Sequence, residues 1–341
     1  MAPRHRVFSS ALTGGFSAIG RGPVSALPVS ADVVVVGGGI IGLTTALELT
    51  RAGARVCVLD RGLPGREASW AGGGILSPLP PDQSVPEIQD LLDESLARYP
   101  AYCTELREAT GVDPEYWVCG ARVYGAAGER WFPEVAQIRN PRLLQALLLA
   151  LRQQGVTIHP YVPATGWAKA AGRLAGVTTP FGTVACRQAV LAAGAWSGQV
   201  AGISVQPIKG QMLLLQDQGD APAHIVMDEH AYLVPRRGGG VVVGSTLESV
   251  GFDTSPTAAA RSALIGHAAR LWPGSDRWSA QHHWVGLRPG GNGIKPLIGP
   301  VSGLDGLFVN TAHFRLGITL SLASAARVRR MLAEQAKAGV P

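Results

Sequence analysis

The sequence predicts an α/β fold of two domains, in which a Rossmann-like domain is interrupted by an inserted domain built on an antiparallel sheet. Three observations carry this prediction. The chain shows an early apolar strand, glycine-rich turn and helix, then a middle dominated by strand-like runs, then a closing strand and long helix. With 341 residues, 46% of them hydrophobic and 16% charged, the chain is long enough to bury a full core.

The first predicted unit is a βαβ unit. Val33–Val36 reads as a short buried strand, residues 40–52 have apolar side chains at helical spacing, and residues 55–59 form the next strand. Gly53 is expected to end the helix. Because the strands of a βαβ unit are parallel, we expect this sheet to be covered on both faces.

Later elements follow from the same patterns. The proline-rich residues 78–86 predict an exit from the first unit, and residues 88–109 predict an amphipathic helix. Further strands are expected at 116–124, 156–161, 183–190, 206–215, 232–235 and 240–245. Further helices are expected at 140–154, 257–271 and 318–334.

Composition excludes several classes of protein. Three of the six net positive charges are Arg4, Arg6 and Arg21, and no basic stripe with interleaved aromatic residues occurs, so we expect no nucleic-acid partner.

Four cysteines without a CxxC pair predict neither disulfides nor a metal site and fit a cytoplasmic protein. No apolar run approaches the roughly 18 residues of a membrane span. Residues 1–30 are interpreted as a disordered tail or targeting segment.

The sharpest motif is the glycine turn after the first strand. Gly37, Gly39 and Gly42 form a GxGxxG pattern that begins a helix. In such a turn the first glycine permits the bend, the second lets a pyrophosphate approach, and the third permits close packing of helix and strand. Asp60 follows at the end of the second strand, where a carboxylate can accept hydrogen bonds from a ribose. The motif predicts an adenine dinucleotide.

The same motif suits FAD or NAD, and a later segment favours FAD. Residues 66–75 place Ser69 and then small residues just past the second strand. A bulky flavin needs such a path to run over the backbone. The other glycine run, residues 238–240, precedes a strand and does not join a strand to a helix, which argues against a second nucleotide site for NAD(P)H.

The chain resembles the D-amino-acid-oxidase superfamily of FAD-dependent amine oxidases, and the glycine oxidases of thiamine biosynthesis in particular. The resemblance rests on residues 33–62 and on a series of shorter blocks in the same order as in the family. These blocks are ASWAGGGILSP (68–78), VLAAGAWS (190–197), PIKGQML (207–213), YLVP (232–235), GLRP (286–289) and HFRLGI (313–318). The resemblance implies the glutathione-reductase-like FAD fold. It places the FAD-binding domain at 31–80, 137–204 and 290–335, and the substrate domain at 81–136 and 205–289.

The resemblance also implies where FAD is held. Residues that match the family's contacts follow the glycines, the second strand and the small-residue segment, and they return before the last helix. They are Ile40, Ile41, Asp60, Arg61, Ala68, Ser69, Gly73, Gly74, Ile75, Val162, His313, Phe314, Arg315, Leu316, Gly317, Ile318 and Thr319. A helix N-terminus aimed at the flavin stabilises the negative charge that reduction creates. Cys186 is the last cysteine and Ala71 follows Trp70, so the residues that carry covalent FAD in relatives are absent and FAD is expected to be non-covalent.

Arg288 is the expected substrate-binding residue, because a planar guanidinium pairs with a carboxylate through two hydrogen bonds. The resemblance assigns a second carboxylate contact to Tyr232, and Arg315 adds positive charge near the ring. His230, His282 and His283 are interpreted as structural. Two departures from the family pattern, Ala312 and Leu316, lie at the flavin face, and the region between residues 124 and 131 is shortened.

The expected activity is oxidation of glycine, sarcosine or a small D-amino acid. A hydride passes from the substrate to flavin N5, the imine hydrolyses to a 2-oxo acid and ammonia, and O2 is reduced to H2O2. A homo-oligomer is expected from the relatives. Three alternatives stay open: an amine dehydrogenase with a protein electron acceptor, an NAD(P)H-driven reductase or hydroxylase, and an FAD protein associated with tRNA modification.

Overall fold

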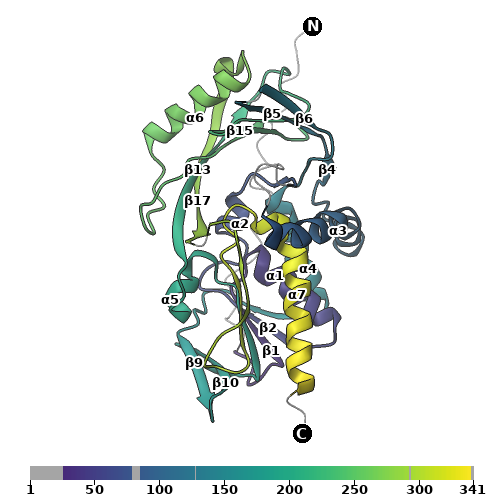
Figure 1. Ribbon diagram of the computed structural model, residues 1–341, viewed down its shortest axis with the longest axis vertical. Helices are drawn as coiled ribbons and strands as arrows, with labels where there is room; N and C mark the ends of the chain where they lie inside the picture. The colour runs from purple at the N-terminus through teal and green to yellow at the C-terminus, as the bar shows by residue number, and fades with distance from the viewer. Residues whose placement is uncertain (1–25, 79–84, 127, 292, 339–341) are drawn as a thin grey trace.

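The computed structural model describes residues 26–78, 85–126, 128–291 and 293–338 (Figure 1). Two large sheets lie toward opposite ends of the elongated molecule, with α6, β5 and β6 at one end and β1, β2, β9 and β10 toward the other. This arrangement agrees with the predicted α/β fold of a Rossmann-like sheet and a second, antiparallel sheet.

The first sheet contains the predicted βαβ unit. Its six strands have the order β18-β19-β12-β1-β2-β8. Their bounds are β1 (Val33–Val36), β2 (Val56–Leu59), β8 (Thr157–His159), β12 (Gln188–Leu191), β18 (Leu297–Pro300) and β19 (Leu307–Thr311). β1 pairs in parallel with both β2 and β12, and only β18 runs antiparallel, against β19. The prediction of parallel strands around a first helix, α1 (Ile40–Arg51), is confirmed.

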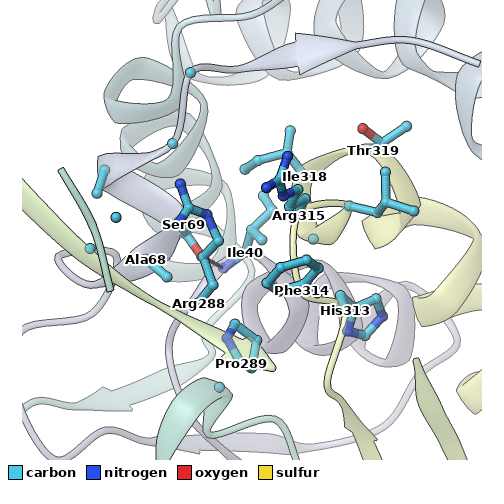
Figure 2. A pocket seen from close by; sticks show the side chains of 18 of the residues that line it. Ile40, Ala68, Ser69, Arg288, Pro289, His313, Phe314, Arg315, Ile318 and Thr319 are labelled. Atoms are coloured by element: carbon cyan, nitrogen blue, oxygen red, sulfur yellow. Dashed lines mark hydrogen bonds between the residues drawn. The ribbon is translucent and has the colours of Figure 1, made fainter. Parts of the chain in front are cut away.

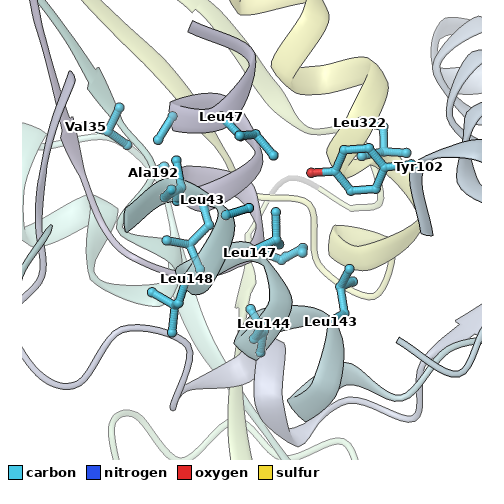
Figure 3. Close-up of a cluster of buried hydrophobic side chains, with 14 of the residues drawn as sticks. Val35, Leu43, Leu47, Tyr102, Leu143, Leu144, Leu147, Leu148, Ala192 and Leu322 are labelled. Carbon is cyan, nitrogen blue, oxygen red and sulfur yellow. The ribbon is translucent and has the colours of Figure 1, made fainter. Parts of the chain in front are cut away.

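Both faces of this sheet are covered, as predicted. On one face the helices α1, α3 (Pro86–Thr110), α4 (Asn140–Gln153) and α7 (Gly317–Ala338) pack together around a cluster that includes Leu43, Leu143, Leu147 and Tyr102 (Figure 3). On the other face lies a sheet of β9 (Gly166–Ala170), β10 (Arg173–Thr179) and β11 (Gly182–Ala185). Alternate residues of β1 therefore enter different clusters, which explains its unbroken run of valines.

The second large sheet is mostly antiparallel, with the order β17-β13-β16-β15-β14-β5-β6. Its strands are β5 (Ala121–Gly125), β6 (Gly128–Phe132), β13 (Gln206–Gln216), β14 (Ile225–Met227), β15 (Tyr232–Pro235), β16 (Val241–Gly244) and β17 (Ser279–Gly290). Helix α6 (Ala258–Leu271) covers one face through Leu264 and Ala268, and Thr257 caps it by accepting from the Ala260 N–H. The uncovered face is left to line the site described below.

Small elements connect the two large sheets. A three-stranded sheet contains β3 (Ile75–Leu76), β7 (Ala136–Gln137) and β4 (Trp117–Val118). The short helices are α2 (Ala68–Ala71) and α5 (Ser197–Ala201), with 3-10 turns at Gly194–Trp196 and Ser275–Arg277. Helix α3 belongs to the range 81–136, yet its residues Tyr99 and Leu106 pack with the helices of the first sheet. The domain limits themselves stay a prediction.

Several sequence-based elements are wrong in detail. The predicted strand 183–190 is two strands, because Cys186 and Arg187 separate β11 from β12 and the two belong to different sheets. The predicted strand 116–124 divides into β4 and β5 at Gly120, where φ is +72°. Strand β17 was missed altogether, since its polar residues near His282 conceal a strand that forms through distant pairing with β13.

The start of the fold also differs from the prediction. Residues 1–25 and 79–84 lie outside the described residues. The chain joins the fold before residue 31, where the FAD-binding domain was predicted to start, because Val29 accepts a hydrogen bond from the Ala185 N–H at 3.1 Å and Ala31 donates one to the Ala185 carbonyl at 3.0 Å. Within the described ranges, no helix combines the length and the apolar character required to cross a bilayer.

Candidate active site

A cavity of about 1170 Å³ extends from the glycine turn of the first sheet to the open face of the second. It brings together all the residues that the sequence selected for the site, apart from Gly42 and Val162. These residues come from the β1–α1 turn, the α2–β3 segment, β15, β17 and the start of α7. Figure 2 shows Arg288 and Arg315 entering one space beside Ile40, Ser69 and Phe314.

The nucleotide end of the cavity has the geometry that the glycine motif predicts. Gly37 has a φ of +111°, and a Cβ there would lie 2.4 Å from the Ala192 carbonyl oxygen. The Asp60 carboxylate accepts from the Gly38 N–H at 2.6 Å and from the Gly62 N–H at 2.7 Å. These bonds fix the carboxylate at the cavity wall, and a carboxylate has further lone pairs that can accept from a ribose.

Gly42 and Val162 do not line the cavity. Gly42 lies in the first turn of α1, where a Cβ would be 1.8 Å from the Gly37 carbonyl oxygen, so its part is the close packing that the motif requires. Val162 is buried and donates its backbone N–H to the Asp60 carbonyl at 2.8 Å. The next residues, Pro163 and Ala164, face the cavity in its place.

Trp196 is a cavity residue that the sequence did not single out. Its ring lies 4.3 Å from the guanidinium carbon of Arg61 and 5.5 Å from the ring of Phe252. The contact holds Arg61 over an aromatic face next to Asp60. The signal for Trp196 was present in the VLAAGAWS block, where the tryptophan follows a strand that ends at the cavity.

The loop before α7 is tied to the second sheet and contains a buried neutral histidine. The Phe314 N–H donates to the Pro289 carbonyl at 3.1 Å. Burial lowers the pKa of His313 to about 3, so its imidazole is neutral at ordinary pH.

Ala312, one of the two departures from the family pattern, has a φ of +61°. This conformation favours glycine, which is the residue usual in the family at this position. Leu316 packs beside Leu320 instead of presenting a polar group.

Buried polar groups without protein partners show that the cavity is built for a polar ligand. Asn310 Oδ1 and His313 Nδ1 are buried and have no partner within the described residues, and both residues line the cavity. Gly73 and Gly74 are buried too, and in the described parts of the chain their N–H groups donate to no protein acceptor. Orphaned buried groups are rare in proteins, so a dinucleotide that pairs with them fits this cavity.

Arg288 projects from β17 into the second-sheet end of the cavity. Its Nη2 donates to Ser245 Oγ at 2.6 Å and its Nη1 to the Thr246 carbonyl at 3.2 Å. Burial lowers the pKa of Arg288, Tyr232 opposes this shift, and the charge of Arg315 lowers the pKa further. The hydrogen bonds that hold this guanidinium come from neutral oxygens, so its charge is available to an anionic ligand.

Tyr232, on β15 of the second sheet, lies against Gly73 at the same end of the cavity as Arg288. Its hydroxyl contacts Met212 Sδ at 3.3 Å, and its ring would lie 2.8 Å from a Cβ at Gly73. Gly244 leaves similar room, because a Cβ there would meet the Tyr232 hydroxyl at 2.6 Å. His230, His282 and His283, interpreted as structural from the sequence, are not among the residues that line the cavity.

The shortened region between residues 124 and 131 forms the β5–β6 hairpin, whose residues Tyr124, Gly125, Gly128 and Arg130 border the cavity. Within the described residues no cluster of three or more His, Cys, Asp or Glu side chains suited to a metal ion is found. The side chains that line the second-sheet end of the cavity include those of Arg288, Arg315 and Tyr232.

Comparison with known proteins decides the family. The profile of the DAO family, described as FAD dependent oxidoreductase, matches residues 32–130 and 121–331. The chain belongs to this family. The DAO-family protein is accordingly an FAD-dependent amino-acid oxidoreductase, and its cofactor is FAD.

Individual relatives agree with this assignment. The DAO-family protein is 39% identical to a glycine oxidase of Pseudomonas aeruginosa, over 87% of this chain and 93% of the relative. It is 31% identical to the bifunctional protein ThiO/ThiG of Trichormus variabilis, over 89% of this chain and 53% of that longer protein. Its fold matches a crystal structure of glycine oxidase from Geobacillus kaustophilus with a TM-score of 0.86 and 25% identity, covering 90% of this chain and 95% of that one.

A substitution at Gly210 on β13 tests whether substrate binding depends on the present position of the Arg288 guanidinium. A Cβ at Gly210 would lie 2.2 Å from Nη1 and 2.5 Å from Cζ of Arg288. Gly210→Ala is therefore expected to displace the guanidinium and raise KM for the amino-acid substrate at least about tenfold, which corresponds to about 1.4 kcal/mol. Steady-state kinetics together with the flavin absorbance would check this.

The control is Gly266→Ala on the exposed face of α6, where an added Cβ meets nothing within 4 Å. Its KM should match that of the unsubstituted protein. An unchanged KM in Gly210→Ala, with a full complement of FAD, would contradict the proposed role of Arg288.

Proposed function

We propose that this protein oxidises a small primary or secondary amino acid, with glycine, sarcosine and small D-amino acids as candidates. The observation that carries the proposal is Arg288, a guanidinium that enters the FAD cavity and is held there by the neutral oxygens of Ser245 and Thr246. Such a group suits a substrate carboxylate, because a bidentate pair fixes both affinity and orientation. The amine carbon would then lie over the cofactor.

Each residue has a distinct part in this proposal. Arg288 binds the carboxylate, the Tyr232 hydroxyl supplies a second contact, and Arg315 adds positive charge on the same side of the cavity. Bound FAD would supply the acceptor for the hydride of the substrate's α-carbon and the route of its electrons to O2, which would yield H2O2. The imine product hydrolyses in water to the 2-oxo acid and ammonia, or to the 2-oxo acid and methylamine when the substrate is sarcosine. The contribution of the chain is thus mainly positioning and electrostatics.

A protein base is not part of the proposal, and the contacts of Asp228 argue against this residue as one. Asp228 lines the cavity, but its carboxylate accepts from Arg270 at 2.6 Å and from the backbone N–H groups of His230 and Ala231. Burial raises the pKa of Asp228, but these hydrogen bonds outweigh burial and the net pKa is lowered. A carboxylate engaged in this way is a poor proton acceptor, so the substrate amine is expected to react in its neutral form.

The relatives support this reaction class and suggest a setting. A relative named glycine oxidase matches most of the chain, and another is named ThiO/ThiG. On this basis we propose that the reaction feeds thiazole and thiamine biosynthesis. We also propose that FAD is held non-covalently and that the protein forms a homo-oligomer, which size-exclusion chromatography would check.

The decisive experiment is anaerobic reduction of the purified yellow protein. We expect glycine, sarcosine or a small D-amino acid to bleach the visible flavin bands, and we expect heat denaturation to release free FAD. On admission of air, the colour should return with one H2O2 formed per substrate oxidised.

Two outcomes would overturn parts of the proposal. Bleaching by dithionite but by no amino acid of the panel would exclude the proposed substrate class. Bleaching by an amino acid without peroxide in air would indicate a dehydrogenase that uses a protein acceptor instead of O2.

A further inference from the structure

Residues 69–74 run from α2 to the start of β3, and four of their six carbonyl groups accept hydrogen bonds from side chains. Asn140 Nδ2 donates to the carbonyl oxygens of Ser69 at 2.9 Å and Gly72 at 3.0 Å. Trp284 Nε1 donates to the Ala71 carbonyl at 3.0 Å. We call residues 69–74 the carbonyl-anchored segment. Its anchors come from α4 and β17, which are far apart in the sequence.

Arg236 supplies the last of these anchors and is the only charged one among the described residues. Its Nη2 donates to the Gly73 carbonyl at 2.7 Å, and its Nη1 donates to Gln137 Oε1 at 3.0 Å and lies 3.4 Å from the Ile138 carbonyl oxygen. These partners are neutral. The residue is half-buried and keeps its charge, since burial and the charge of Arg139 lower the pKa of Arg236 only to about 10.

The orientation of the carbonyls decides where the N–H groups point. In a trans peptide the C=O and the following N–H are antiparallel. The Gly72 and Gly73 carbonyls point to Asn140 and Arg236, so the N–H groups of Gly73 and Gly74 point the opposite way. Both glycines are buried and line the cavity, and within the described residues these N–H groups have no protein acceptor.

The two N–H groups belong to residues at the end of the cavity that the flavin would occupy, away from the glycine turn. The phosphate end is the turn of Gly37 and Gly39, whereas Gly73 is beside Tyr232, at the end that also contains Arg288. We propose that Arg236 is a positioning residue that turns and polarises the Gly73–Gly74 peptide toward the flavin and raises the flavin's reduction potential. A donor aimed at a group that gains negative charge stabilises the reduced form, and a nearby cation adds to that effect.

This inference rests on FAD binding and not on the identity of the amine. It is tested on the holoenzyme without any substrate, by dye-coupled dithionite reduction, so it can fail while the proposed function stands. Arg236→Met keeps the length and packing of the side chain but removes the charge and both donors. We expect the equilibrium constant for two-electron reduction to fall about tenfold or more, which corresponds to a negative shift of about 30 mV in midpoint potential.

A second measurement reports on the oxidised enzyme alone. Loss of a nearby cation should raise the pKa of the flavin N3–H, which a spectral titration of the bound flavin measures. The matched control is Arg237→Met, because Arg237 is the next residue, is exposed, and lies over the Trp117 ring at 5.4 Å. That variant should keep both the potential and the N3–H pKa of the unsubstituted enzyme.

Arg236→Gln covers the case in which Arg236→Met does not retain FAD. Gln can still donate to the Gly73 carbonyl but carries no charge, so the potential should fall by less than in the Met variant and the N3–H pKa should still rise. The inference is overturned if the neutral variant that retains FAD has the potential and N3–H pKa of the Arg237→Met control.

Discussion

Replacing Arg288 by Met is expected to lower kcat/KM for the amino-acid substrate by at least about 100-fold, the largest loss of activity that we predict. The guanidinium is held by Ser245 Oγ and the Thr246 carbonyl and enters the cavity beside Tyr232. Removing one partner of a buried, hydrogen-bonded charge pair costs about 2–5 kcal/mol, and 100-fold corresponds to about 2.8 kcal/mol. Steady-state kinetics on protein with a full complement of FAD measures this effect.

Two further variants, one conservative and one at the surface, serve as comparisons for Arg288→Met. Arg288→Lys keeps the charge but loses the planar fork, so it should recover only part of the lost kcat/KM. Arg173→Met removes an exposed arginine whose partner is Asp305 at 3.1 Å, and it should leave the kinetics unchanged. Wild-type kinetics in Arg288→Met would mean that the substrate's acid group binds elsewhere or that the substrate has none.

Gly42→Ala should have the largest effect on stability and cofactor binding. The added Cβ would lie 1.8 Å from the carbonyl oxygen of Gly37 and 3.0 Å from its carbonyl carbon, and backbone atoms of a packed turn cannot move aside cheaply. Ordinary overpacking costs about 1–3 kcal/mol, and this clash between backbone and Cβ should cost more. A typical domain has only about 5–15 kcal/mol of stability. We therefore expect a colourless or insoluble product.

Visible absorbance and thermal unfolding with added FAD check this prediction. The matched control is Gly266→Ala, also a glycine within a helix, where replacing glycine by alanine is expected to stabilise by about 0.5–1 kcal/mol. A yellow Gly42→Ala protein with an unchanged melting temperature would show that the turn tolerates a side chain, against the reasoning used for the whole glycine motif.

The features that the sequence predicted well depend on local contacts. The turn at Gly37, the packing of Gly42 against it and the carboxylate of Asp60 lie within one βαβ unit, where strand, turn and helix follow one another along the chain. The family resemblance extended this reading to Arg288, Tyr232 and the loop before α7, and the structure brings these residues into one cavity.

The features that the sequence did not reveal depend on contacts between distant elements. Strand β17 was missed because its pairing with β13 spans residues on either side of α6. Asn140 lies in α4, Trp284 in β17 and Arg236 directly after β15, and all three side chains contact the carbonyl-anchored segment, which no local sequence pattern indicates. One weak signal existed, since Arg236 follows Tyr232 by four residues, a spacing that places two side chains on the same face where the chain stays extended.

The two large sheets line different parts of the cavity, and this division affects how the substrate preference of the enzyme can change. The glycine turn predicted to receive the pyrophosphate belongs to the six-stranded sheet, while Met212, Met227, Val123 and Phe132 line the cavity from the seven-stranded one. Substitutions at these four positions reshape the room for a substrate side chain without touching the glycine turn or Asp60. We therefore expect single changes at these positions of the seven-stranded sheet to alter amine preference while the glycine turn and Asp60 stay unchanged.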